Sequence, residues 1–392
     1  MRDTTQANAA EQAVSGHSQH IIIHSNNNIV RHPSIACHWL LCGLLCLPLL
    51  LPSPAMASKK SHSRKDIGAQ SHAYRHHKEA MQFADALAQR RGLDRAWVRQ
   101  AIGEARFIPA IRKQMEPADH GFVKNWNVYR SRFIEPVRIQ SGIAFWKANA
   151  ETLARAEKTY GVSPEVIVGI IGVETIYGRH MGSYRVIDAL STLAFDFPKT
   201  TDRDRSAFFK DELEEFLAME YQAHRDVATI KGSYAGAIGL GQFMPSSLAK
   251  YAIDFDGDGV IDLRNSQADA IGSIANFLHA WHWQPGIPVY YPITIDVANL
   301  NKATLLAPDI LPTFSADTLS ANGVHLDEKD QQYPGRLSLV ELLNGDPETD
   351  GAEPTYVAGT ENFYVISRYN RSSYYTLAVT ELGETIKTEM SK

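Results

Sequence analysis

One acidic residue, Glu174, stands near the end of an unusually apolar segment, residues 163–178. Ser163 and Pro164 are typical of a helix start, and Gly178 predicts where the helix ends. Burial and the negative end of a helix both disfavour a charged carboxylate, so we expect a raised pKa, as a general acid requires. The alternative is a structural glutamate with a buried partner. The aliphatic residues before it are Val166, Ile167, Val168, Ile170, Ile171 and Val173.

A second group with chemical potential is the aspartate-rich segment at residues 254–265, which resembles an EF-hand calcium loop. Alternate aspartates supply oxygen ligands, and Gly259 allows the sharp turn at the sixth position. Asn265 stands where the motif has a bidentate glutamate, so Asp269 in the next helix is expected to supply the missing carboxylate. The sequence predicts a weak or structural Ca²⁺ site, with an ordinary surface turn as the alternative. The candidate ligands are Asp254, Asp256, Asp258, the Val260 carbonyl and Asp269.

The glycine-rich segment at residues 232–246 fits neither a phosphate loop nor a nucleophile elbow, because the required Lys and Ser positions are missing. We expect its glycines to line a groove for a bulky polymer, with Ser233 and Gln242 as polar contacts. The alternative is a tight loop packed for structural reasons alone. The many tyrosines and tryptophans of the chain suit a carbohydrate ligand.

The first 57 residues predict a secretory signal peptide, because the apolar stretch 40–51 precedes Ala55 and Ala57. All three cysteines lie in this part, so the predicted mature chain has no disulfide, which is compatible with a bacterial periplasm. Large residues precede Cys42 and Cys46, which disfavours a lipid anchor. Residues 58–78 are basic and predict a flexible tether, either a solvated linker or a contact with an anionic envelope surface.

The overall composition is that of an ordinary globular protein, with 44% hydrophobic residues and a formal charge of −5. No strongly basic field indicates nucleic acid, and a monomer is expected. We predict an α+β fold that is mainly α. Residues 79–283 form the α region and core, residues 284–351 a small β-containing insertion, and residues 352–392 return to the core, with a strand at 363–366 and a closing helix at 374–388. Gly169 and Gly172 predict close approach of another backbone to the apolar helix.

Several segments together resemble the lytic murein transglycosylase B family, in the right order from about residue 80 to 390. They are residues 172–179, 232–247, 254–265, 271–277 and 368–370. The resemblance implies a lysozyme-like core with an added α region and a small β insertion.

The resemblance also implies cleavage of the β-1,4 bond between N-acetylmuramic acid and N-acetylglucosamine in peptidoglycan, with 1,6-anhydromuramoyl ends as product. Glu174 is then the single catalytic acid and base. The implied contacts with sugar or with the acid are Tyr129, Ser233, Gln242, Tyr369, Asn370 and Tyr375. The implied partners are peptidoglycan glycan strands, with other cell-wall enzymes as further candidates, and a periplasmic location with outer-membrane association is expected.

Two other functions remain open from the sequence. A hydrolytic muramidase on the same fold would need a second carboxylate, for which Asp188 or Asp196 are candidates. A non-catalytic protein that binds peptidoglycan or calcium is the other alternative. An acid kept in an apolar helix argues against a pure binding protein.

Overall fold

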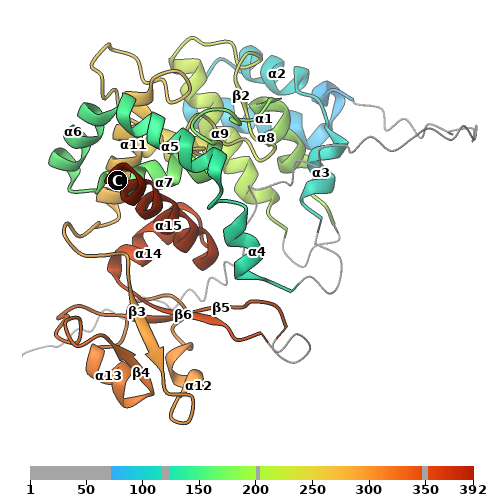
Figure 1. The fold of residues 1–392 in the computed structure, drawn as a ribbon. Helices are drawn as coiled ribbons and strands as arrows, with labels where there is room; N and C mark the ends of the chain where they lie inside the picture. The colour runs from blue at the N-terminus through green and yellow to red at the C-terminus, as the bar shows by residue number, and fades with distance from the viewer. Residues whose placement is uncertain (1–71, 117–122, 200–203, 347–351) are drawn as a thin grey trace, which may run out of the picture. The chain divides into compact units, whose positions relative to one another are not determined.

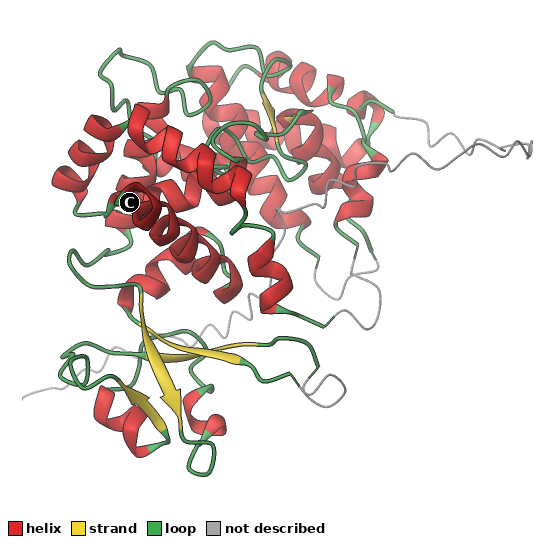
Figure 2. Cartoon of the chain, viewed as in Figure 1, coloured by secondary structure: helices red, strands yellow, loops and turns green. Residues whose placement is uncertain are grey.

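The computed structural model describes residues 72–116, 123–199, 204–346 and 352–392. The predicted signal peptide and most of the predicted tether, through residue 71, lie outside these residues. Across the described ranges, no helix is both long enough and apolar enough to span a membrane. The described residues are mainly helical and form two small antiparallel sheets, which confirms the predicted fold class (Figures 1 and 2).

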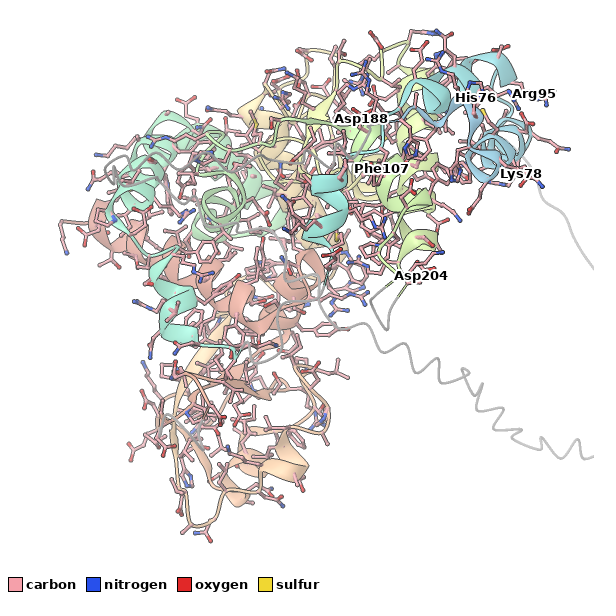
Figure 3. The ribbon with its side chains drawn as sticks, turned by 90° about the vertical axis from the view of Figure 1, so that its right-hand side faces the viewer. His76, Lys78, Arg95, Phe107, Asp188 and Asp204 are labelled. Atoms are coloured by element: carbon pink, nitrogen blue, oxygen red, sulfur yellow. The ribbon has the colours of Figure 1, made fainter. Side chains whose placement is uncertain are left out.

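A first group of helices shares one apolar core near the N-terminal side of the described chain. Asp94 caps the start of one of these helices, α2 (Arg95–Glu104), because its side chain accepts a hydrogen bond from the Trp97 amide. Figure 3 shows this part of the molecule, with Arg95, Phe107 and Asp188 labelled. The group comprises the 3₁₀-helix η1 (Tyr74–His76), α1 (Lys78–Arg91), α2 (Arg95–Glu104), α3 (Pro109–Gln114), α8 (Val186–Phe195) and α9 (Ser206–Gln222).

A second, larger core is built around α7 (Pro164–Thr175), the predicted apolar helix. Its longest partner is α15 (Ser373–Met390), which packs along it (Figure 1). The other helices that contribute are α4 (Trp126–Ser131), α5 (Pro136–Ala148), α6 (Ala150–Tyr160), α10 (Pro245–Tyr251), α11 (Gln267–Ala280) and α14 (Glu361–Tyr369).

The packing of α7 against α15 depends on small residues, as predicted. A Cβ on Gly169 would lie 2.2 Å from the Val379 carbonyl oxygen, and one on Gly383 would lie 2.1 Å from the Glu165 carbonyl oxygen. A Cβ on Gly172 would meet the Tyr177 and Leu382 side chains instead, so the predicted close approach of a backbone is confirmed at Gly169 and not at Gly172. Because only hydrogen fits at these points, the two helix backbones can approach closely.

The predicted β-containing insertion holds a four-stranded antiparallel sheet in the order β4-β3-β6-β5. Register is set by pairs such as Tyr290 with Gly359 and Val340 with Val357. The last strand lies beyond residue 351, so the sheet takes in part of the segment expected to return to the core. The elements are β3 (Tyr290–Ile295), α12 (Lys302–Leu305), α13 (Ala316–Ala321), β4 (Val324–Leu326), β5 (Ser338–Leu342) and β6 (Thr355–Gly359). A separate two-stranded sheet pairs β1 (Tyr184–Arg185) with β2 (Lys231–Gly232).

The predicted strand at residues 363–366 is wrong, because this stretch lies inside α14. Thr360 caps the helix by accepting a hydrogen bond from the Asn362 amide, and the buried Phe363 and Ile366 fall on one helical face. A short run of aromatic and β-branched residues fits either a strand or a buried helix. The predicted closing helix is confirmed as α15.

Candidate active site

Helix α7 ends one residue after Glu174, and it ends without the predicted glycine. The residue that leaves the helix is Ile176, with φ 50°, followed by Tyr177 with φ 55° and only then by Gly178 with φ 90°. Left-handed backbone costs a β-branched residue roughly 1–2 kcal/mol. The surrounding packing therefore holds strain directly beside the acid, as often found at functional sites.

Glu174 is half-buried and lies near the end of a helix whose other residues are almost all apolar and buried. Burial raises its pKa to about 7, and a hydrogen bond from Tyr375 opposes this rise. The Tyr375 hydroxyl donates to Glu174 Oε1 at 2.7 Å. In the described part of the chain Glu174 forms no ion pair. A carboxylic acid with such a pKa is substantially protonated near neutral pH, as a general acid must be.

Tyrosines surround this acid. Burial, followed by the negative charge of Glu174, raises the pKa of both Tyr369 and Tyr375 well above the usual range, so both hydroxyls remain donors. The Tyr369 hydroxyl donates to the Gly241 carbonyl, and its ring packs against Phe243. The Tyr129 ring packs edge-to-face against the Tyr374 ring at a centroid distance of 5.8 Å.

The next residue in the chain, Asn370, has a buried side-chain oxygen. No described residue donates a hydrogen bond to Asn370 Oδ1. Since a buried acceptor without a donor is costly, this atom is a candidate contact for a bound ligand.

Ser233 and Gln242, the two predicted polar contacts of the glycine-rich segment, are both buried. Ser233 Oγ accepts hydrogen bonds from the amides of Ala235 and Ala237, so it organises the loop as well as being a candidate contact. Gln242 has φ 51°, and its amide group donates to the Gly239 carbonyl at 2.8 Å.

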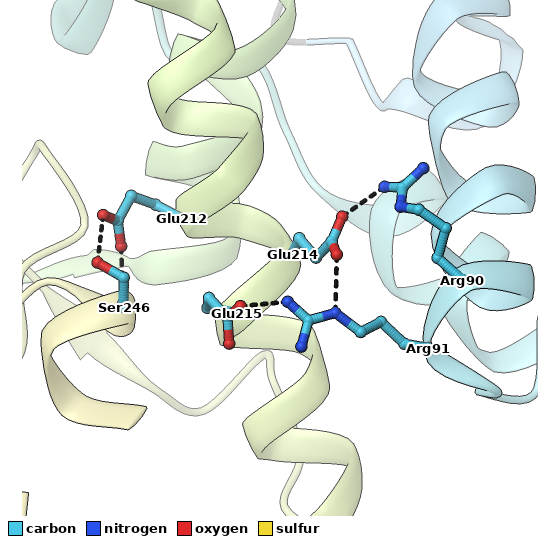
Figure 4. A network of polar contacts seen from close by, with 6 residues as sticks. All are labelled: Arg90, Arg91, Glu212, Glu214, Glu215 and Ser246. Carbon is cyan, nitrogen blue, oxygen red and sulfur yellow. Dashed lines mark hydrogen bonds and ion pairs between the residues drawn. The ribbon is translucent and has the colours of Figure 1, made fainter. Parts of the chain in front are cut away.

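Three positioning residues were missed in the sequence. Thr175 Oγ1 donates to the Leu240 carbonyl at 2.9 Å, which ties the end of α7 to the glycine-rich segment. The buried Arg138 donates from Nε to the Gly172 carbonyl at 2.9 Å, two residues before the acid. Glu212 on α9 accepts from the Ser246 amide and hydroxyl, which anchors the start of α10 (Figure 4). The only signal for Thr175 was its place beside Glu174, and Arg138 and Glu212 gave none.

The two aspartates considered as a second carboxylate have structural partners instead. Asp188 on α8 accepts from the Arg106 amide at 2.8 Å and pairs with Arg185 at 2.6 Å. Asp196 accepts from the Tyr74 hydroxyl at 2.6 Å. Both belong to the first helical group, where these bonds account for their presence.

The aspartate loop brings three carboxylates together. Oxygen atoms of Asp254, Asp256 and Asp269 lie within 4.8 Å of one another. Asp269 is fully buried on α11 and accepts hydrogen bonds from the Phe255 and Asp262 amides at 2.8 Å. Asp258, a predicted ligand, lies outside this described trio. Three negatively charged carboxylates this close repel one another unless a cation neutralises them. Their hard oxygen atoms are suitable ligands for Ca²⁺.

The loop itself is wrapped around Asp254. Its carboxylate accepts from the amides of Gly257 and Gly259 at 2.6 and 2.8 Å, and these bonds hold its pKa below the usual value. The geometry therefore fits a cation held by the trio and the loop.

A sequence profile described as "Transglycosylase SLT domain" matches residues 75–384. This match and the single acid among tyrosines define the class of the protein, a transglycosylase. The Membrane-bound lytic murein transglycosylase B of Escherichia coli (strain K12) is 37% identical over 343 residues, 86% of this chain and 89% of that protein. The chain therefore belongs to the lytic murein transglycosylase B family.

Solved structures agree with this assignment. The E. coli lytic transglycosylase Slt35 in complex with calcium has a TM-score of 0.70 and 35% identity, and the match covers 85% of this chain and 100% of that one. SltB3 from Pseudomonas aeruginosa in complex with NAG-anhNAM-pentapeptide has a TM-score of 0.65 and 28% identity, with 79% of each chain covered. The fold is thus the lysozyme-like transglycosylase fold that was expected.

Proposed function

We propose that this protein is a lytic transglycosylase that cleaves the β-1,4 bond between N-acetylmuramic acid and N-acetylglucosamine in peptidoglycan and leaves 1,6-anhydromuramoyl ends. The observation that carries this proposal is Glu174, an acid with a pKa of about 7 whose hydrogen-bond partner among the described residues is a tyrosine. Ordinary glycosidases need a pair of carboxylates. A single one suffices when a group of the substrate takes the second role.

The protonated Glu174 donates its proton to the glycosidic oxygen as the bond from that oxygen to muramoyl C1 breaks. The substrate's own 2-acetamido group stabilises the positive charge at C1. The Glu174 carboxylate then removes the proton from the muramoyl 6-hydroxyl while O6 bonds to C1. The acid is regenerated and no water is consumed. The Tyr375 hydroxyl stabilises the carboxylate between the two transfers.

We assign the groove to residues that the fold holds near this acid. Besides burial, the negative charge of Glu174 raises the pKa of both Tyr369 and Tyr375, so both lie close enough to interact with the acid. Asn370 offers a hydrogen-bond acceptor with no described partner. Tyr129 adds an aromatic surface beside Tyr374. Ser233 and Gln242, both buried in the glycine-rich segment, are each proposed to contact sugar from a fixed loop.

The aspartate loop is proposed to hold one structural Ca²⁺, as the calcium complex of Slt35 supports. The proposed ligands are carboxylates of Asp254, Asp256 and Asp269, with Asp258 and the Val260 carbonyl completing the shell. The ion would neutralise these groups and fix the loop, and it takes no part in the proton transfers.

The substrate is proposed to be glycan strands that carry peptides on their muramoyl residues, since the SltB3 complexes contain NAG-anhNAM-pentapeptide and NAG-NAM-pentapeptide. The predicted signal peptide and the membrane-bound relative from E. coli favour export to the periplasm, with association to the outer membrane and to other cell-wall enzymes as further proposals. Cell fractionation and N-terminal sequencing of the mature protein test the location.

The decisive experiment is digestion of purified sacculi followed by mass spectrometry of the muropeptides. The wild type should release anhydromuramoyl products, and Glu174→Gln should lower turnover by a factor of about 10³ or more while sacculus binding persists. Glu165→Gln is a matched control, because Glu165 lies on the same helix and pairs with Lys387 at 3.0 Å. Reducing muramic ends would indicate the muramidase instead, and unchanged lysis by Glu174→Gln would remove the proposed acid.

A further inference from the structure

A pocket of about 590 Å³ lies apart from the residues around Glu174, where α10, the end of α11, the sheet-containing insertion and α14 meet. Its walls mix aromatic rings with charged side chains. The lining residues that matter here are Lys250, Trp281, His282, Arg336, Glu361 and Tyr364. Neither the proposed catalytic step nor the calcium loop uses any of these residues.

The lining of this pocket carries more positive than negative charge, with Lys250 and Arg336 against Glu361. Among the described residues of the lining, Glu361 alone carries a carboxylate, and its two oxygens already accept hydrogen bonds from the Tyr333 hydroxyl and the Arg336 amide. Lys250 and the Arg336 side chain are exposed, and no ion pair joins either of them to a described carboxylate. Two cations that converge on one pocket without acidic partners favour an anionic ligand.

The walls of the pocket also point to a ligand rather than to simple packing. Trp281 is 39% exposed although it is large and apolar. His282 follows it with φ 68°, at a helix end where glycine is usual. Tyr364 lines the pocket, and Arg368, which lies behind the lining, stacks on the Tyr364 ring at 4.2 Å.

The pocket is within reach of a substrate bound at the acid. Tyr364 lines the pocket, and Tyr369 and Asn370 lie at the end of the same helix, beside the proposed site. Five residues of helix rise about 7.5 Å. An extended peptide of five residues spans up to about 17 Å. A peptide attached to a sugar beside Glu174 is therefore long enough to enter the pocket.

We infer that this pocket binds the carboxylate-bearing peptide of peptidoglycan, with Lys250 and Arg336 pairing with its carboxylates and Trp281 and Tyr364 packing against its chain. This inference rests on the proposed function, because it assumes that the glycan strand is the substrate. It makes the enzyme selective for strands that still carry their peptides.

The test compares two substrates, peptide-bearing glycan strands and the same strands after an amidase has removed the peptides. In Lys250→Gln/Arg336→Gln, KM for peptide-bearing strands should rise about fivefold to thirtyfold, as expected for two partly screened ion pairs, while kinetics on peptide-free strands stay unchanged. The wild-type KM for peptide-bearing strands should also rise with salt concentration. Lys113→Gln/Lys147→Gln removes two exposed cations elsewhere and serves as the matched control.

Three outcomes separate the claims. An equal rise in KM on both substrates would mean that the pocket binds glycan, and no rise on either would mean that it binds neither part; both overturn the inference. In both cases anhydromuramoyl products would still form, so the proposed function would stand. If the wild type forms no such products from either substrate, the proposed function itself fails.

Discussion

At the residue scale, the chemistry depends on the balance of two opposing effects on Glu174. Loss of hydration favours the neutral acid, and the hydrogen bond from Tyr375 favours the carboxylate. Burial dominates, so the pKa rises to about 7 while the carboxylate keeps one strong donor. A group that must first give and then take a proton benefits from a pKa near the working pH.

Replacing Tyr375 by phenylalanine tests this balance. Because the hydroxyl stabilises the charged form, its loss should raise the pKa of Glu174 further. The acid is active when protonated, so the alkaline limb of kcat/KM against pH should move to higher pH. The maximal rate should fall about tenfold, because the carboxylate formed in the first transfer loses a charge-assisted hydrogen bond.

The control for this prediction is Tyr374→Phe. The Tyr374 hydroxyl donates to the Leu343 carbonyl at 3.2 Å rather than to the acid, so its loss should leave the alkaline limb in place. A limb that stays fixed in Tyr375→Phe, or that moves to lower pH, would show that the hydrogen bond does not set the protonation of Glu174.

At the element scale, the site depends on how closely α7 and α15 approach, since Glu174 lies on one helix and Tyr375 on the other. Gly169 and Gly383 permit this approach because any side chain there would overlap a backbone carbonyl of the other helix. Thr175 and Arg138 then hold the C-terminal end of α7. The distance between acid and tyrosine hydroxyl is thus set by packing along the whole helix pair.

Gly169→Ala should therefore destabilise the fold by about 1–3 kcal/mol, as expected for overpacking, and should lower activity by displacing Glu174 from Tyr375. Gly103→Ala on α2 is the matched control, because its added Cβ would meet its nearest neighbour at an ordinary 3.5 Å. That change should be neutral or stabilising by up to about 1 kcal/mol, since alanine favours helix. Urea unfolding measures both variants, and equal stability of the two would contradict the close-approach argument.

The sequence predicted the features that arise from local pattern. The apolar run of α7, its glycines and the aspartate spacing each indicate one structure, and the structure contains them. It did not predict features that arise from residues distant in the chain. The run at 363–366 fits strand and helix equally until the capping by Thr360 is known. Arg138, Glu212 and the pocket around Trp281 depend on tertiary contacts that no local pattern encodes.

At the scale of the whole molecule, the aspartate loop connects the parts that form the site. The Leu240 amide, in the glycine-rich segment, donates to the Leu263 carbonyl of the loop at 2.8 Å. Arg264 donates to the Lys231 carbonyl at 2.7 Å, beside the two-stranded sheet. Because Thr175 also binds Leu240, the loop is linked through one residue to the end of α7. A cation in the loop would therefore support the groove as well as its own turn.

Calcium should raise the thermal stability of the protein, and a chelator should reverse the effect. A ligand that binds only the folded state stabilises it by about 2.7 kcal/mol at one hundred times its Kd, which calorimetry detects as a clear rise in Tm. Asp256→Asn should remove most of this rise, whereas Asp317→Asn, an exposed acid on α13, should keep it. Turnover should fall on chelation in parallel with Tm, because the linked glycine-rich segment loosens. If neither calcium nor chelator changes the Tm, the hydrogen bonds from backbone amides to Asp254 and Asp269 are sufficient to hold the loop without an ion.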